Sequence, residues 1–530
     1  METNSITIVG GGSAGWMTAA TLIKNFPEKQ ISVIESPNVP TVGVGESTLG
    51  QINLWLYTLG IEDKDWMSSC DASYKLSIKF TNFYENDNSS FHYPFGYPEG
   101  FDRNLMPEAL MDWYHRKALH PELPVENFAD TFYPVMSFVH NNKFCPYTMQ
   151  KLGFHTEQAA AYHFDATKFG IWLRDNYCIP NGVDHIQANV ESISSDETGI
   201  TGLVLDNNDY EEADLYIDCT GFKSILLNEL GAEFTSYSDI LPNDSAWATR
   251  LPYTDKDKEL KPYTNCTALG NGWVWDIPLW SRVGTGYVFS SEFTSDEDAL
   301  EEFKNHLRTD RDVPVSQETI DSLEFKKIDM RVGIHDEIFL KNVCAIGLAA
   351  GFIEPLESNG LYTVHEFLHS LVHTLQRNTV SQFDKDAFNE KCKGNFRAFA
   401  EFVALHYALS IRQDTPYWKN CLQMKRPKQL PLPGFYATYG FDNLKFSHRE
   451  NNQVMDKTNG IVPISAGMNW FPFDKPTMMR RLYEEHRLDY VDYLEEQFPH
   501  WDKMLERRNS AVEMCSSLPE YLKENIHHER

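Results

Sequence analysis

The 530-residue sequence lacks the features that mark secreted, membrane-spanning or metal-binding chains. Its nine cysteines are an odd number and include no C-x-x-C pair, which argues against both a disulfide framework and a metal site. No apolar run approaches the ~20 residues that a transmembrane helix needs. The chain leads into Ile6–Val9 without the basic region of a signal peptide, so we expect a cytoplasmic protein.

Basic residues are also scarce. The chain has 47 Lys and Arg against 76 Asp and Glu, a net charge of −29. Nucleic acids and anionic membrane surfaces both need a basic face on their partner, so we expect neither as a partner here. An acidic surface of this kind favours solubility, and it leaves open whether the chain forms a homo-oligomer.

The first 35 residues instead predict a nucleotide-binding opening. Ile6–Val9 has the composition of a buried strand, Trp16–Asn25 has helical character, and Ile31–Ile34 predicts a second strand. Between the first strand and the helix, Gly10-Gly11-Gly12-Ser13-Ala14-Gly15 satisfies G-x-G-x-x-G. In this context Gly10 permits a tight turn, Gly12 lets the backbone approach a pyrophosphate, and Gly15 lets the helix approach the strand. Ser13 and Ala14 lie where the helix N-terminus faces the phosphates.

Glu35 lies twenty residues beyond Gly15, at the end of the second predicted strand, where a carboxylate accepts hydrogen bonds from a ribose. A nicotinamide enzyme could share this opening. However, Asp218-Cys219-Thr220-Gly221 and the strand that runs into Gly347 resemble later flavin-contacting segments of two-dinucleotide-binding-domain flavoproteins. No second G-x-G-x-x-G is present, so we expect FAD, reduced by a separate NAD(P)H-dependent flavin reductase.

The rest of the chain fits the α/β fold of the two-dinucleotide-binding-domain flavoproteins, in its hydroxylase-like form, with inserted β-rich segments and a helical C-terminal cap. We expect a FAD-binding core over 1–375, with nucleotide-binding parts at 1–80, 160–235 and 325–375, and a cap over 376–530. The segments 80–160 and 235–325 indicate irregular or antiparallel β structure. Amphipathic patterns predict helices over Asp165–Asn176, Leu361–Gln376, Phe383–His406 and Asp474–Gln497, with long loops over 413–473.

Several motifs resemble those of the flavin-dependent halogenases, above all the tryptophan halogenase group. They are Gly15-Trp16 after the glycine loop, the strap-like Gly43–Thr48, the lysine segment Ala72–Phe80, the W-x-W-x-I-P signature Trp273–Pro278 and the segment Phe352–Gly360. Shorter similarities are His163–Ala166, Asn243–Ala246, Gly284–Tyr287 and Asp414–Trp418, all in the family's order. The resemblance covers residues 6 to about 420.

The resemblance implies that reduced FAD, dioxygen and a halide make hypohalous acid, which Lys75 and Glu357 direct onto an electron-rich aromatic substrate. A lysine in an apolar stretch is usually a surface residue whose aliphatic stem is buried, and we expect Lys79 to be of this kind. Lys75 gains its role only from the resemblance. Glu357 would polarise the hypohalous acid or take a proton from the substrate, whereas Glu354 is expected to be structural.

Further sites follow from the same resemblance. It places flavin contacts at the glycine loop, Glu35, Val44, Gly45, Glu46, Val190, Gly347, Leu348 and Leu361, the halide at Asn359 and Gly360, and substrate or tunnel residues at Tyr93, Phe95, Trp273, Trp275 and Ser358. In the family the two tryptophans screen the space near the flavin, although two alternating tryptophans on a strand can also simply pack.

Two departures concern specificity. Tryptophan halogenases typically have threonine where this chain has Asn359, so bromide or iodide as well as chloride is open. They place a pocket histidine where this chain has Tyr93, and their substrate clamps have no recognisable counterpart over roughly 430–475. We therefore expect an indole or phenol type of substrate, without assuming tryptophan. The alternatives are a flavin monooxygenase and a FAD-binding protein without catalysis.

Overall fold

The computed structural model describes residues 1–38, 45–98, 113, 116–377, 379–424, 460–470, 475–484 and 486–528. These residues form two compact units. Unit 1 comprises Met1–Ser73, Ala161–Tyr253 and Leu279–Ala400, and unit 2 comprises Tyr74–Ala160, Thr254–Pro278 and Glu401–Arg530. Both units are assembled from separate stretches of sequence, and the boundary expected after residue 375 stays a prediction. Among the described helices, none is long and apolar enough to cross a membrane.

Unit 1 is built on a six-stranded sheet of order β20-β21-β12-β1-β2-β8. The pairs β12–β1, β1–β2, β2–β8 and β12–β21 are parallel, and only β20 runs antiparallel to its neighbour. The strands are β1 (Ser5–Val9), β2 (Gln30–Glu35), β8 (Asp184–Gln187), β12 (Leu215–Asp218), β20 (Phe339–Leu340) and β21 (Val343–Ala345). The predicted strands at the N-terminus and around residues 215 and 343 are confirmed.

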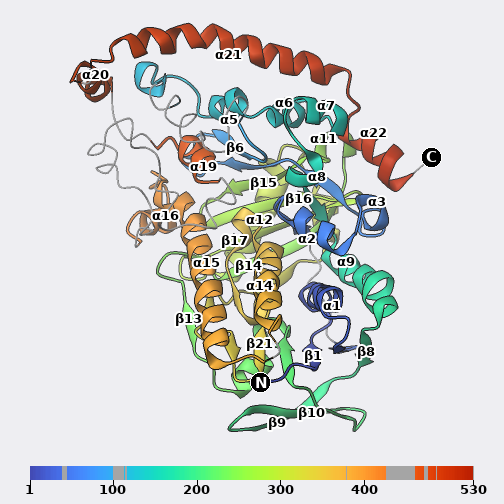
Figure 1. The fold of residues 1–530 in the computed structure, drawn as a ribbon. Helices are drawn as coiled ribbons and strands as arrows, with labels where there is room; N and C mark the ends of the chain where they lie inside the picture. The colour runs from blue at the N-terminus through green and yellow to red at the C-terminus, as the bar shows by residue number, and fades with distance from the viewer. Residues whose placement is uncertain are drawn as a thin grey trace. The chain divides into compact units, whose positions relative to one another are not determined.

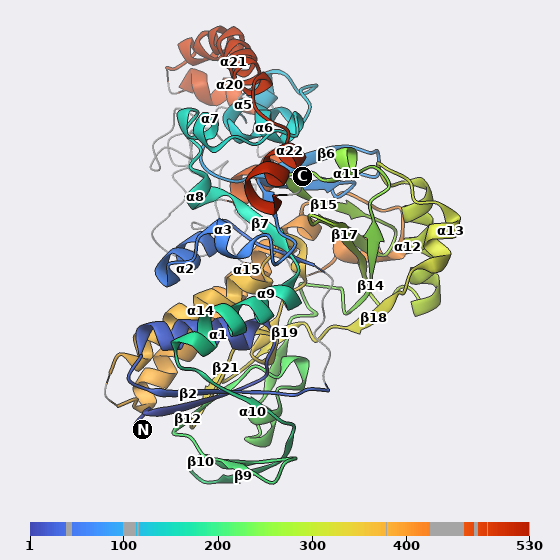
Figure 2. The ribbon, with the colours of Figure 1, turned by 90° about the vertical axis from the view of Figure 1, so that its right-hand side faces the viewer.

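Helices cover one face of this sheet. In Figure 2, α1 (Ser13–Asn25), α9 (Ala166–Trp172) and α14 (Gly360–Leu375) lie on the same side of β2 and β12. The helix α1 contacts both α9 and α14. Nine of the residues in α1 are buried, from Gly15 to Ile23, because the helix is apolar on nearly all sides. On the opposite side lies the sheet β11-β10-β9, made of Tyr210–Glu211, Gly199–Leu205 and Val190–Asp196.

The predicted helices near residues 170 and 370 are confirmed. The side chain of Asp165 caps α9 by accepting hydrogen bonds from the backbone N–H of Thr167 and Lys168 at 3.0 and 3.1 Å. After α9 the chain continues as the π-helical segment Leu173–Cys178. Helix α14 packs beside α15 (Gln382–Ala408), where Tyr362 meets Phe399 with ring centroids 5.3 Å apart (Figure 1).

The remaining elements of unit 1 include the predicted antiparallel β structure. The strand β14 (Ser245–Pro252) pairs with β17 (Arg282–Phe289) and β18 (Lys326–Asp329), and a second small sheet joins β13 (Phe234–Ser236), β19 (Gly333–His335) and β22 (Gly351–Phe352). Other elements are β3 (Glu46–Ser47), β7 (Ala161–Phe164), α2 (Ile52–Leu59), α3 (Asp63–Trp66), α10 (Ile225–Glu229), α12 (Asp296–Thr309) and α13 (Gln317–Ser322).

Unit 2 has strands in the order β16-β15-β5-β6, namely Gly272–Pro278, Tyr263–Ala268, Ser77–Thr81 and Ser90–Pro94. The short β4 (Ser73–Lys75) lies at the junction with unit 1. Helices of unit 2 are α5 (Asn127–Phe132), α6 (Val135–His140), α7 (Pro146–Lys151), α8 (Thr156–Ala159), α11 (Lys256–Glu259), α16 (Pro416–Cys421), α19 (Ile461–Gly467), α20 (Lys475–Glu484), α21 (Asp489–Glu513) and α22 (Leu518–Leu522).

The expectation of β or irregular structure over 80–160 is wrong for its second half. Among the described residues of this range, β5 and β6 form an antiparallel pair, and the four short helices α5–α8 lie between residues 127 and 159. None of these helices exceeds six residues, so no apolar period of 3.6 is long enough to be recognised, and helices this short depend on tertiary packing. Contacts with α21 supply packing for α5 and α6. The predicted helix over Asp474–Gln497 is instead the two helices α20 and α21.

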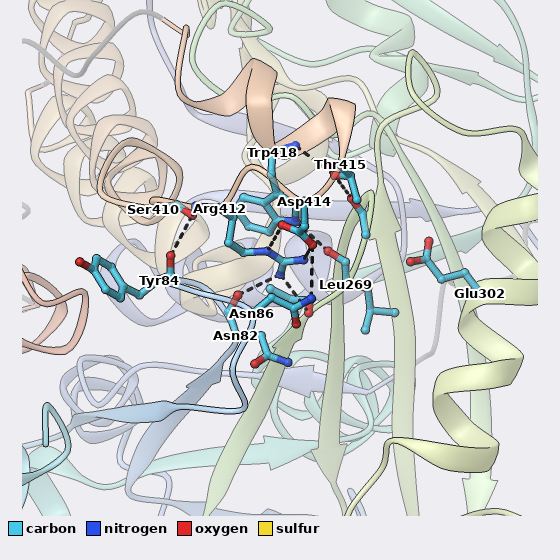
Figure 3. A network of polar contacts seen from close by, with 12 residues as sticks. Asn82, Tyr84, Asn86, Leu269, Glu302, Ser410, Arg412, Asp414, Thr415 and Trp418 are labelled. Carbon is cyan, nitrogen blue, oxygen red and sulfur yellow. Dashed lines mark hydrogen bonds and ion pairs between the residues drawn. The ribbon is translucent and has the colours of Figure 1, made fainter.

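Figure 3 shows the polar network that joins three segments of unit 2 around Arg412. The guanidinium donates to both carboxylate oxygens of Asp414 at 3.0 and 2.7 Å, and Nη1 donates to the carbonyl of Asn82 at 2.9 Å. It also lies 4.3 Å from the ring of Trp418 in α16. The Arg412 side chain is only 2% exposed, so this ion pair is shielded from solvent on the arginine side. The hydrogen bond from Arg412 holds the pKa of Asp414 below its ordinary value.

Replacing Arg412 with Ala should therefore lower the free energy of unfolding by about 1–3 kcal/mol, because the carbonyl of Asn82 loses its donor, whereas Asp414, which is 34% exposed, can be solvated by water. Arg412→Lys should restore little of it, because an ammonium cannot bind both carboxylate oxygens and the Asn82 carbonyl in one plane. Urea denaturation measures the loss. The control is Arg377→Ala, whose side chain is 67% exposed beside Asp384 and should cost no more than about 1 kcal/mol. Equal effects of the two alanine variants would contradict the role given to Arg412.

Candidate active site

The glycine loop after β1 forms a cradle that leaves no space for side chains. A Cβ atom at Gly10, where φ is +120°, would lie 2.3 Å from the carbonyl oxygen of Cys219. A Cβ atom at Gly15 would lie 1.9 Å from the carbonyl oxygen of Gly10. Gly12 is the N-cap of α1, and Ser13 and Ala14 form its first turn. The bare backbone and the helix N-terminus at this position fit a dinucleotide pyrophosphate.

Glu35 lies at the carboxyl end of β2, beside this cradle. A Cβ atom at Gly11 would lie 2.2 Å from its Cγ atom. One carboxylate oxygen of Glu35 is 2.8 Å from Nε2 of His185 and 3.4 Å from Nη1 of Arg174. The His185 ring in turn packs edge-on against Trp16, with centroids 5.2 Å apart. The Arg174 guanidinium donates a hydrogen bond to this carboxylate, whereas the geometry at His185 Nε2 does not make one. The sequence pattern pointed to neither residue.

The segment after β2 contributes Glu46. Val44, a predicted flavin contact, and Gly43 lie outside the described residues. Gly45 has φ +109° and precedes β3, whose Glu46 and Ser47 pair with Phe164 and His163 of β7. A Cβ atom at Gly360 would lie 2.7 Å from Oε1 of Glu46, so this carboxylate reaches the N-terminus of α14.

The other predicted flavin contacts lie on separate elements of unit 1. Gly347 has φ +71° and follows β21, and a Cβ atom there would lie 2.8 Å from Cβ of Ala14. This brings the turn of Gly347 and Leu348 next to the glycine loop. Leu361 is buried in the first turn of α14, and Val190 begins β9 opposite Leu205.

Asp218 ends β12 and organises the turn that follows. One of its carboxylate oxygens accepts from the backbone N–H of Thr220 at 3.0 Å, and the other accepts from Leu226 at 2.8 Å. Asp218 is completely buried. Its role is thus to hold the β12–α10 turn that puts the Cys219 carbonyl against Gly10.

The segment Glu354–Gly360 is a tight turn that leads into α14. Glu357 closes the short 3-10 helix Pro355–Glu357 and is completely buried, and Ser358 takes a left-handed conformation with φ +57°. The Ser358 hydroxyl donates to Ser47 Oγ at 3.1 Å. Asn359 is the N-cap of α14, and its Nδ2 donates to the carbonyl of Ile353 at 3.3 Å. Its buried Oδ1 has no hydrogen-bond partner among the residues that the structure describes.

Glu354 differs from Glu357 in its partner. The amide of Asn243 donates to Oε2 of Glu354 at 2.7 Å, and both side chains are buried. The expectation of a structural Glu354 agrees with this hydrogen bond. Asn243 begins one of the motifs shared with the halogenases, and this contact gives that motif a physical meaning that the sequence alone did not provide.

Lys75 is the last residue of β4, two residues before β5 begins, and is completely buried rather than a surface residue. Its ammonium is 5.0 Å from the ring centroid of Phe95, a distance at which a cation is attracted to an aromatic face. The adjacent residue fixes the backbone, because Leu76 N–H donates to Pro262 at 2.7 Å and the Leu76 carbonyl accepts from Phe95 at 2.9 Å. Tyr93 packs edge-on against Phe95, with centroids 5.6 Å apart.

Trp273 and Trp275 lie on β16, as the sequence predicts, and are 1% and 7% exposed. Their ring centroids are 6.1 Å apart. Burial and mutual packing are what two alternating tryptophans would show in either interpretation, so their proposed screening role rests on the motif.

Comparison with known proteins gives one consistent result. The tryptophan halogenase family model matches residues 5–435. The 7-chloro-L-tryptophan 6-halogenase KtzR of Kutzneria sp. (strain 744) is 33% identical over 454 residues, 81% of this chain and 82% of that protein. The tryptophan 7-halogenase RebH of Lentzea aerocolonigenes is 32% identical over 438 residues, 78% of each chain.

Solved structures agree. The apo structure of VirX1 has a TM-score of 0.88 at 37% identity and covers 99% of this chain and 100% of its own. The tryptophan 6-halogenase SttH of Streptomyces toxytricini has a TM-score of 0.81 at 28% identity, covering 98% and 99%. With the glycine cradle, the conserved order of motifs and these matches together, the chain belongs to the tryptophan halogenase family of flavin-dependent halogenases.

Proposed function

We propose that this enzyme makes hypohalous acid from a halide and that Lys75 and Glu357 direct it onto an electron-rich aromatic ring. The observation that carries the proposal is the buried ammonium of Lys75 lying 5.0 Å from the ring of Phe95. The ammonium lies beside an aromatic ring on which a flat substrate can stack.

Lys75 acts on the oxidised halogen. Its ammonium donates a hydrogen bond to the oxygen of hypohalous acid and so makes the halogen more electrophilic, or its amine takes up the halogen as a haloamine. The two hydrogen bonds of Leu76 keep the lysine backbone from moving, which fixes where the halogen is presented.

Glu357 acts on the proton. Electrophilic attack leaves a cationic ring that must lose a proton, and a carboxylate excluded from water is a suitable base. The turn Pro355–Ser358, with Ser358 anchored to Ser47, holds this carboxylate in one position. Glu354 has a structural role instead, because it accepts a hydrogen bond from Asn243 and so stabilises the turn.

Residues of unit 1 hold the flavin. Reduced FAD, when bound, activates dioxygen so that the halide can be oxidised. The backbone of Gly10–Gly15 receives the pyrophosphate, Glu35 the ribose, and Gly45, Glu46, Val190, Gly347, Leu348 and Leu361 line the rest of the cofactor, while Trp273 and Trp275 keep the substrate from it. Reducing equivalents come from a separate NAD(P)H-dependent flavin reductase, because the sequence has no second dinucleotide motif.

The halide binds at Asn359 and Gly360, where backbone N–H groups of α14 begin the helix without intrahelical partners. The unpaired Oδ1 of Asn359 disfavours a small, strongly hydrated anion more than a large one, because burying charge costs more for a smaller ion. We therefore propose that bromide or iodide is accepted as well as chloride.

The substrate is an indole or phenol type of arene. The relative RebH is a tryptophan 7-halogenase. In this chain Tyr93, rather than a histidine, stands beside the Phe95 wall, and it also packs against Phe402 with centroids 6.4 Å apart. A tyrosine there offers an apolar ring and a hydroxyl, which favours neutral aromatic substrates of varied shape.

Lys75→Ala should lower the rate of halogenated product by at least about 100-fold, because it removes the group that positions the halogen. Product is measured by mass spectrometry with an indole panel, bromide and a flavin reductase. FAD binding and NADH-driven oxygen consumption should stay unchanged. The matched control is Lys79→Ala on β5, four residues on and partly exposed, which should retain the wild-type rate. Unchanged halogenation in Lys75→Ala would remove this lysine from the mechanism, and oxygenated but unhalogenated product from the wild type would indicate a monooxygenase.

Glu357→Gln should lower kcat by roughly 100-fold or more while leaving the melting temperature near that of the wild type, because the amide fills the same space but takes up no proton. Glu354→Ala is the contrasting variant. It leaves the Asn243 amide unsatisfied and should lower the free energy of unfolding by about 1–3 kcal/mol. Steady-state kinetics and thermal denaturation separate the two. A Glu357→Gln enzyme with wild-type kcat would refute the role of this carboxylate.

Asn359→Thr should shift halide use towards chloride. In competition at equal bromide and chloride concentrations, we expect the brominated-to-chlorinated product ratio to fall by about 5- to 10-fold, which corresponds to roughly 1–1.4 kcal/mol. Asn176→Thr, at an exposed position in the π-helical segment, is the control and should leave the ratio unchanged. An unaltered ratio in Asn359→Thr would mean that this side chain does not select the halide.

A further inference from the structure

Two distant segments of unit 2 lie side by side as a short antiparallel bridge. Lys143 is paired with Ser517. The backbone N–H of Phe144 donates to the carbonyl of Ser516 at 3.1 Å, and that of Leu518 donates to the carbonyl of Asn142 at 2.9 Å. These bonds fix the register between the segment before α7 and the segment between α21 and α22.

This register brings two cysteines together. Each segment has a cysteine two residues from the bridge, namely Cys145 after Lys143 and Cys515 before Ser517. The backbone of Cys145 is extended, with φ −158° and ψ 97°. The two thiols are close enough for each to shift the pKa of the other, and neither is in a disulfide. A sulfur–sulfur bond requires the two side chains to face each other across neighbouring backbones, which is the arrangement that this register provides.

The pair also has the asymmetry of a reactive and a resolving thiol. Cys145 is half-buried, whereas Cys515 is 7% exposed. Partial burial acts to raise the pKa of Cys145, but Thr148, whose hydroxyl donates to Sγ at 3.3 Å, and the neighbouring Cys515 thiol outweigh it and lower that pKa. By contrast, burial raises the pKa of Cys70, Cys178 and Cys219 well above the ordinary value. Thiolate character is what makes a cysteine open to oxidation.

We propose that Cys145 and Cys515 form a reversible disulfide when the protein meets a peroxide-class oxidant. The Cys145 thiolate attacks a peroxide oxygen, the O–O bond breaks, and hydroxide leaves, which yields a sulfenic acid; the hydroxide takes up the proton that the thiol had released and becomes water. The Cys515 sulfur then attacks the Cys145 sulfur, the S–O bond breaks, and the departing hydroxide takes the Cys515 proton to form a second water. One peroxide is reduced and two thiols are oxidised. The chemistry does not rest on the proposed halogenation.

The disulfide would join the C-terminal segment covalently to the part of the chain that packs against Tyr74, the neighbour of Lys75. Phe144, next to Cys145, stacks on Tyr74 with centroids 4.2 Å apart and contacts Tyr521 of α22 at 4.8 Å. Tyr74 is the residue before Lys75. A disulfide between Cys145 and Cys515 would join the residue after Phe144 to the segment that leads to Tyr521, and so would limit how far this aromatic cluster next to Lys75 can move.

The test uses the full chain, reduced, freed of reductant and then treated with hydrogen peroxide. Remaining thiols are alkylated, and peptides are mapped by mass spectrometry without reduction. We expect a single cross-linked species that joins the peptides of Cys145 and Cys515 with the loss of two hydrogens, a faster band on a non-reducing denaturing gel, and reversal of both by dithiothreitol. Cys145→Ser and Cys515→Ser should each abolish the link, while Cys421→Ser, a buried cysteine of α16 in the same unit, should keep it.

Oxidation of the exposed Met514 serves as an internal control that peroxide has reached this surface. Met514, next to Cys515, is 93% exposed and is converted to the sulfoxide when peroxide reaches this surface. Met514 sulfoxide in a wild-type protein whose Cys145 and Cys515 are both still alkylated would overturn the proposal. So would a link from Cys145 to any other cysteine, or irreversible oxidation of Cys145 without a link. Because these readouts are made on the wild type, they do not depend on whether the serine variants fold.

Discussion

Backbone crowding at the carboxyl end of β1 constrains the whole of unit 1. Gly10 lies so close to the Cys219 carbonyl, and Gly15 so close to the Gly10 carbonyl, that any side chain at either position would overlap with backbone. These approaches set the distance of α1 from β1 and of β1 from the turn after β12. Asp218 fixes that turn with its own hydrogen bonds. The flavin cradle therefore depends on segments more than two hundred residues apart that are held at backbone contact.

The same constraint explains which parts of the structure the sequence could predict. A strand, a glycine loop and a helix that must meet within thirty residues leave a local pattern, so β1, α1, β2 and the position of Glu35 were predictable. Trp273 and Trp275 on β16 were also predictable from their alternation. The family resemblance supplied Lys75 and Glu357, but their complete burial was not foreseen, because a lysine in an apolar stretch and two glutamates in a turn are usually solvated.

What the sequence could not predict depends on contacts between distant segments. The helices α5–α8 are too short to carry a period and take their stability from packing. Arg412 joins Asn82, Ala268 and Asp414 across more than three hundred residues, and no local pattern distinguishes it from an exposed arginine. The cysteine spacing contains no C-x-x-C pair. It could not detect Cys145 and Cys515, because only the register at Lys143 and Ser517 brings them together.

Arg174 and His185 change how the adenosine end of the cradle is understood. A carboxylate at Glu35 would be free to rotate if water were its only partner, and a ribose would then have to order it on binding. With Arg174 donating to it at 3.4 Å and the His185 ring beside it, the carboxylate has less freedom to rotate before any ligand arrives. The His185 ring packs edge-on against Trp16, the tryptophan that follows the glycine loop in the first motif that resembled the family. This contact connects the tryptophan to the surroundings of Glu35, and so gives the Gly15-Trp16 motif a physical reason that the sequence alone did not provide.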